Sequence, residues 1–114
     1  MSDIVRIEAS RPWDGEIIIH RGETFDPEVE FSTDSGVIDW SNHTGELLLY
    51  LGDSTRTLST DDGSLLMRSD GVISPRMSDT ETAAISACNG NFKLFTVDQD
   101  GNRRLFGRGP IEVD

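Results

Sequence analysis

The apolar residues of this 114-residue chain come in short runs separated by glycine-containing turns, and they are rarely at helical spacing. The turn segments are Asp34-Ser35-Gly36, Asp61-Asp62-Gly63, Ser69-Asp70-Gly71 and Asp98-Gln99-Asp100-Gly101. In each of them glycine can take a positive φ, and aspartate can accept hydrogen bonds from nearby backbone amides. This pattern of short apolar runs separated by turns predicts a protein built from short β-strands.

Two hairpins and one helix are the clearest local predictions. Phe92–Val97 and Arg103–Phe106 flank the last of the four turns and should form an antiparallel hairpin. Leu65–Met67 and Val72–Ile73 should form a second. The cap pattern that starts at Ser78 predicts a short helix, which Asn89-Gly90 should end. The predicted strands are 4–9, 16–21, 24–32, 46–51, 64–68, 72–77, 91–97 and, with a break, 103–113.

Many short strands and one short helix favour an all-β fold, an immunoglobulin-like antiparallel β-sandwich with one short helix. The length allows one modest core. We expect residues 1–19 to be an N-terminal arm or first strand, and residues 20–114 to be the sandwich domain. Residues 1–14, which include Trp13, could also reach a neighbouring subunit.

The best strand is apolar on both of its faces. Phe92 and Leu94 lie on one face, whereas Phe95 and Val97 lie on the other. Leu47–Leu51 is apolar throughout as well. Because a sheet in a lone sandwich needs only one apolar face, either the N-terminal segment or another subunit should cover the second. Trp13, Phe95 and Val97 are therefore candidate contacts with a partner.

The charge excludes some partners. With 21 acidic and 10 basic side chains, the formal net charge is −11, which disfavours nucleic acid and anionic membranes. Nine of the basic residues are arginine. Arg103, Arg104 and Arg108 are close in sequence and predict half of a charge-complementary contact, although a solvated strand face is the plainer alternative.

The sequence offers no recognisable catalytic or metal-binding motif. His20 and His43 have no ligand residues at metal spacing, and Asp98–Asn102 departs from the calcium-loop pattern. Asp61-Asp62 is typical of a solvated turn. Cys88 is the only cysteine, so no internal disulfide can form, and it is predicted to be a small buried residue. We therefore predict no catalytic residue, no cofactor and no metal.

Three aromatic side chains suggest an alternative function. Trp13, Trp40 and Tyr50 could form a flat platform for a sugar ring, as in a carbohydrate-binding or adhesin-type module.

Several motifs follow one another in a distinctive order. They are Arg21-Gly22-Glu23-Thr24-Phe25, Asp39-Trp40-Ser41-Asn42-His43-Thr44, Leu58-Ser59-Thr60-Asp61-Asp62-Gly63, the predicted helix at 79–85, Asp100-Gly101, and the closing run from Leu105 to Val113. This order resembles that of small β-sandwich structural proteins of tailed phages, and is similar to the N-terminal domain of the phage baseplate upper protein family. The resemblance covers about residues 20–113.

The resemblance implies a non-enzymatic component of a tailed virus particle, in the tail or baseplate, the neck or the head surface. A head decoration protein of the capsid is an alternative. The implied partners are other virion structural proteins, in a homo-oligomer or symmetric multi-copy assembly, with no nucleic acid, membrane or cofactor. The first residues are charged where a signal peptide is apolar, so we expect assembly in the host cytoplasm and a final location in the virion.

Overall fold

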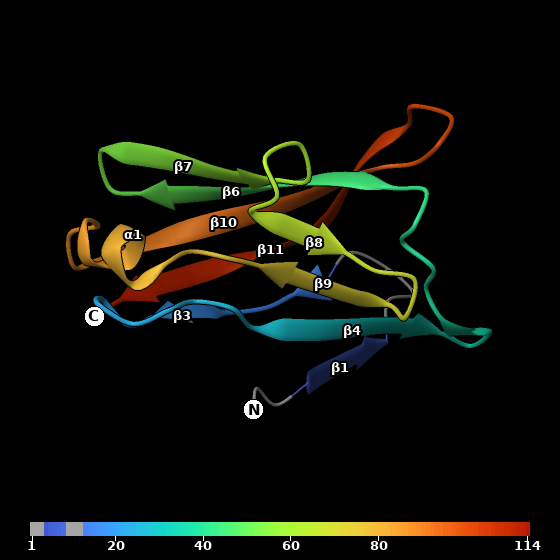
Figure 1. The fold of residues 1–114 in the computed structure, drawn as a ribbon, viewed down its shortest axis with the longest axis horizontal. Helices are drawn as coiled ribbons and strands as arrows, with labels where there is room; N and C mark the ends of the chain where they lie inside the picture. The colour runs from blue at the N-terminus through green and yellow to red at the C-terminus, as the bar shows by residue number, and fades with distance from the viewer. Residues whose placement is uncertain (1–3, 9–12) are drawn as a thin grey trace.

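Two β-sheets pack face to face in the computed structural model, which describes residues 4–8 and 13–114, with side chains described from residue 13 onwards (Figure 1). In sheet A the strand order is β1 (Ile4–Glu8), β4 (Glu28–Thr33), β9 (Val72–Pro75) and β8 (Leu65–Met67), and β5 (Gly36–Val37) pairs with β4. In sheet B the order is β2 (Trp13–Asp14), β11 (Arg103–Val113), β10 (Cys88–Val97), β6 (Thr44–Leu51) and β7 (Ser54–Ser59), and β3 (Ile17–Ile19) also pairs with β11. The predicted all-β sandwich with one short helix is confirmed.

Most neighbouring strands run antiparallel. The parallel pairs in the described residues are β1 with β4, and both β2 and β3 with β11. Pro110 lies within β11 at the gap between β2 and β3, since Arg108 is opposite Asp14 and Ile111 is opposite Ile17. Pro110 is opposite Asn91 of β10, but it has no paired residue on the side of β2 and β3, where a residue without an N–H group is tolerated.

The positive φ values expected for the turn glycines are confirmed. Gly36, Gly63, Gly71 and Gly101 have φ values of 112°, 80°, 86° and 84°. Both predicted hairpins form, β10 with β11 and β8 with β9.

The strand β7 was not predicted. It follows β6 through the two-residue turn Gly52-Asp53, in which Gly52 has a φ of 66°. A glycine followed by aspartate is a known hairpin signal, but β7 reads Ser-Thr-Arg-Thr-Leu-Ser and has one apolar residue, Leu58. The apolar alternation that marked the other strands is therefore missing.

The helix α1 (Asp79–Ala83) starts as predicted and ends early. The Ser78 side chain accepts a hydrogen bond from the Glu81 backbone, and the Glu81 carboxylate accepts one from the Ser78 N–H, which completes a capping box. The prediction that Asn89-Gly90 ends the helix is wrong, because both residues belong to β10. A Cβ on Gly90 would lie 2.0 Å from the Tyr50 carbonyl oxygen, so this glycine allows β10 to approach β6.

The core fills the space between the two sheets. Among its fully buried members are Ile19, Phe31, Leu49, Phe92 and Ile111. Residues 1–3 and 9–12 lie outside the described residues, and the arm predicted for residues 1–14 falls partly on them. Residues 17–19 pair with β11, and the boundary predicted after residue 19 stays a prediction.

Candidate interaction face on sheet B

The central strand β10 has an inner face and an outer face. Phe92, Leu94 and Thr96 are 1%, 3% and 6% exposed and point into the core. Side chains alternate along a strand, so Lys93, Phe95 and Val97 point away from the core. The sequence therefore predicted both faces of this strand correctly.

A β-bulge aligns β11 with the same outer face. Phe95 is opposite Leu105, but Leu94 is opposite Gly107, which leaves Phe106 as the extra residue. The Phe106 ring packs inward, 4.9 Å from Phe31 between ring centroids. Because the bulge resets the alternation, residues 103 and 105 before it and residue 108 after it share the outer face.

We use the name outer B face for the side of sheet B that points away from the core across β6, β10 and β11. Opposite residues on neighbouring strands lie on the same face, so β6 adds residues 46, 48 and 50. Tyr50 is 36% exposed, and the other large apolar members are half-buried. The members of the outer B face around Phe95 are Glu46, Leu48, Tyr50, Lys93, Phe95, Val97, Arg103, Leu105 and Arg108.

The cations on this face lie over its aromatic rings. The Arg103 guanidinium carbon is 3.7 Å from the Phe95 ring centroid, and the Lys93 Nζ is 5.9 Å from that of Tyr50. At exposed sites such contacts contribute about 0.5–1 kcal/mol each. Phe95 is therefore partly covered by a side chain of its own hairpin.

Carboxylates balance the two arginines. Arg103 lies 3.9 Å from Glu46, and Arg108 lies 3.5 Å from Asp14. Both pairs are exposed, so each adds little to stability. On a chain of net charge −11, these pairs leave an apolar row with balanced charge, which suits contact with another protein.

The three arginines do not form the predicted cluster. Arg104 is opposite Thr96, on the other side of the sheet from Arg103 and Arg108. Its charge acts on Asp98, whose pKa is lowered chiefly by the backbone N–H of Asn102 and to a lesser degree by Arg104. Neighbours on a strand point to opposite faces, so closeness in sequence did not make one patch.

Trp13 lies between the sheets and is half-buried. Its ring centroid is 5.5 Å from those of Phe31 and Phe92. Trp13 is thus a packing residue. A role for it at a partner interface stays a prediction, as it does for the five other candidates.

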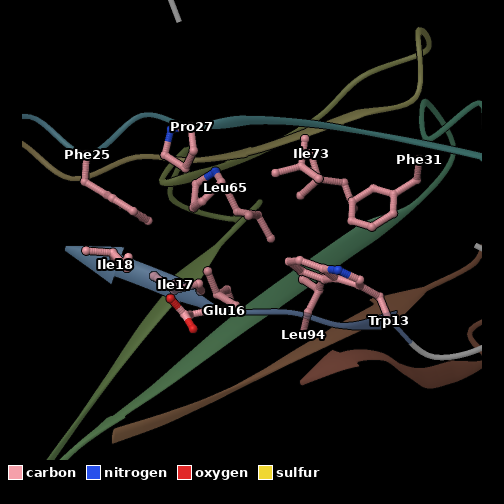
Figure 2. Close-up of a pocket in the computed structure, with 13 residues that line it drawn as sticks. Trp13, Glu16, Ile17, Ile18, Phe25, Pro27, Phe31, Leu65, Ile73 and Leu94 are labelled. Carbon is pink, nitrogen blue, oxygen red and sulfur yellow. The ribbon is translucent and has the colours of Figure 1, made fainter. Parts of the chain in front are cut away.

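An apolar groove opens beside Trp13, between the two sheets (Figure 2). It has a volume of about 190 Å³, and Glu16 is the only charged side chain among the described residues that line it. Figure 2 shows Trp13 below Phe31, with Ile17 and Ile18 on the neighbouring strand. The groove offers mainly apolar contact.

The aromatic platform for a sugar is not formed. Trp40 is 3% exposed, and its Nε1–H donates to the Gly71 carbonyl at 3.1 Å. Tyr50 stands on the outer B face, away from the core position of Trp13. The prediction of a shared platform is therefore wrong.

The titratable candidates lie apart from one another. The exposed His20 meets Asp114 at 2.8 Å, which raises the pKa of the imidazole. His43 packs on Trp40, with centroids 5.1 Å apart, and Cys88 is half-buried at the start of β10. The pKa of Asp62 is lowered by hydrogen bonds from Ser64. Within residues 4–8 and 13–114, no group of three or more His, Cys, Asp or Glu side chains is arranged to hold a metal ion.

None of the helices in the described part of the chain has the length and apolar character needed to cross a membrane.

Comparison with known proteins shows the fold and no family. No family model matches the chain, and no curated protein matches it. Among solved structures, the N-terminal domain of phage TP901-1 ORF48 superposes with a TM-score of 0.60 at 7% identity. The match covers 99% of this chain and 98% of that domain. The two-sheet architecture described above is thus similar, from end to end, to that of a phage protein domain.

Proposed function

We propose that this chain is a non-enzymatic structural component of a tailed phage particle. The observation that carries the proposal is the end-to-end fold likeness to a phage protein domain, together with the ordered motifs of the sequence. In this proposal the chain acts in the tail or baseplate, the neck or the head surface, after assembly in the host cytoplasm. A head decoration protein is the alternative placement.

The outer B face is the proposed docking surface. It presents half-buried Leu48, Val97 and Leu105 around Phe95, and such apolar side chains gain free energy when a partner excludes water from them. The surrounding ion pairs can orient the partner without strong repulsion. The partners are other virion proteins or further copies of the chain in a symmetric assembly.

The location can be tested by electron microscopy. Tailed particles purified from cultures that express the chain should bind an antibody raised against it, at a fixed place on each particle in negative stain. Labelling of tail ends supports a tail or baseplate role, whereas labelling over the head supports decoration. Absence of the chain from every purified particle would exclude the proposal.

A further inference from the structure

The strand β7 forms a long free edge of sheet B. It pairs with β6 from Ser54 to Ser59, and no strand among the described residues pairs with its other side. Figure 1 shows it at the outer rim of the sheet, next to β6. At six residues it is longer than β8, the three-residue strand at one rim of sheet A.

The hydrogen-bond pattern identifies the backbone groups that face outward. The Thr60 N–H donates to the Gly45 carbonyl at 3.2 Å, and hydrogen-bonded pairs recur at every second residue of an antiparallel ladder. The backbone N–H and C=O groups of even-numbered residues of β7 thus bond to β6. Those of odd-numbered residues point away from β6. Ser59 confirms this, since its outward N–H donates to the Ser64 Oγ at 2.9 Å. Thr55 and Thr57 therefore direct their N–H and C=O groups to the free edge.

This edge lacks several of the common protections. Natural edge strands are often shielded by proline, lysine or a bulge, and β7 has none of these. Its one charged residue, Arg56, is opposite Leu49 on the inner side of the sheet and forms an ion pair with Glu81 of α1. The regular pairing with β6 holds β7 in an extended shape that can template a further strand.

We propose that β7 accepts an extended segment of another protein, which adds a strand to sheet B. The incoming strand would bond to the outward N–H and C=O groups of Thr55 and Thr57, as in other cases of strand addition. Its outer side chains would lie beside those of Thr55 and Thr57, which extend the outer B face.

The charges near β7 favour a segment of another protein over a second copy of this chain. If two copies of β7 paired antiparallel with Thr55 opposite Thr57, Arg56 would lie opposite Arg56, and like charges directly opposite are destabilising. Asp53 of each copy would also approach the acidic turn at Asp61 and Asp62 of the other. A segment with Lys or Arg at both ends complements these acids. The inference concerns the edge alone and does not depend on the phage role.

The probe is a fluorescein-labelled peptide, Lys-Thr-Val-Thr-Val-Thr-Lys, titrated with the full chain and followed by anisotropy. Thr57→Pro removes an N–H group that does not bond to β6, so the variant should keep its thermal unfolding temperature while binding about tenfold more weakly. Thr57→Val keeps the N–H and is the matched control, with binding within about twofold of the original chain. A peptide N-methylated on its five central residues lacks the N–H groups that would donate to the Thr55 and Thr57 carbonyls, which tests the reciprocal bonds without altering the protein, and it should not bind.

Each outcome either supports or overturns strand addition at β7. Binding that falls with Thr57→Pro and with peptide methylation, but not with Thr57→Val, supports strand addition. If Thr57→Pro does not fold, the methylated peptide alone decides. The proposal is overturned by absence of binding to the original chain, or by equal binding of both peptides. A concentration-dependent dimer that Thr57→Pro dissolves would assign the edge to a second copy and also overturn it.

Discussion

Replacing Trp13 with alanine tests whether this residue is part of the core. Its ring packs against Phe31 and Phe92 at centroid distances of 5.5 Å, and it covers the backbone at Gly107. A Cβ added at Gly107 would lie 2.8 Å from the Trp13 ring. Gly107→Ala therefore perturbs the same contact from the opposite side.

The expected costs follow from these contacts. Removing a core tryptophan costs about 3–5 kcal/mol of unfolding free energy. For a domain of this size that corresponds to a fall of roughly 10–20 °C in Tm. Gly107→Ala should cost about 1–3 kcal/mol, because the new methyl group displaces the ring. In the Trp13→Ala background that ring is gone, so the second substitution should cost less than about 1 kcal/mol.

The assay is urea unfolding followed by far-UV circular dichroism for the two single variants and the double variant. Tyr50→Ala is the control, since it removes a ring from the outer B face and should cost less than about 1 kcal/mol. Additive effects of Trp13→Ala and Gly107→Ala would refute the packing argument, and so would a Trp13→Ala cost no larger than that of the control.

Three further predictions concern single sites. The hydrogen bond from His20 to Asp114 raises the pKa of His20 above its usual 6.5, so its stabilising effect should be full below that pH and be lost as the pH rises through the raised value; His20→Gln should flatten this part of a stability–pH curve. Ser78→Ala should lower the unfolding free energy by about 1 kcal/mol in urea titrations, because it removes the helix cap. Gly90→Ala should cost about 1–3 kcal/mol or more by the same titrations, since its Cβ would meet the Tyr50 carbonyl oxygen at 2.0 Å, and an unchanged midpoint would contradict this close approach.

Local chemistry made much of the fold predictable. The aspartate–glycine turns fixed both hairpins, and the Ser78 pattern fixed the start of α1. Gly90 misled the prediction because a glycine that ends a helix and a glycine that lets two strands approach look the same in sequence. β7 was missed because its stability comes from pairing with β6, and its own residues carry little apolar periodicity.

The candidate face was predictable only in part. Phe95 and Val97 were identified from alternation along one strand, and the structure places both on the outer B face. Leu105 was not identified, because its place there depends on the register with Phe95. The separation of Arg104 from Arg108 depends on strand alternation and on the bulge at Phe106, whose position follows from tertiary packing.

The central claim is that the chain enters a phage particle through the outer B face, and its most direct test is incorporation of variants into purified particles. The double variant Phe95→Ser with Val97→Ser should fold but be absent from particles, whereas Val37→Ser, which alters an apolar residue that is 50% exposed on sheet A, should be incorporated like the original chain. Quantitative immunoblots of purified particles, normalised to a capsid protein, provide the readout. Equal incorporation of the double variant, or no incorporation of the original chain, would contradict the claim.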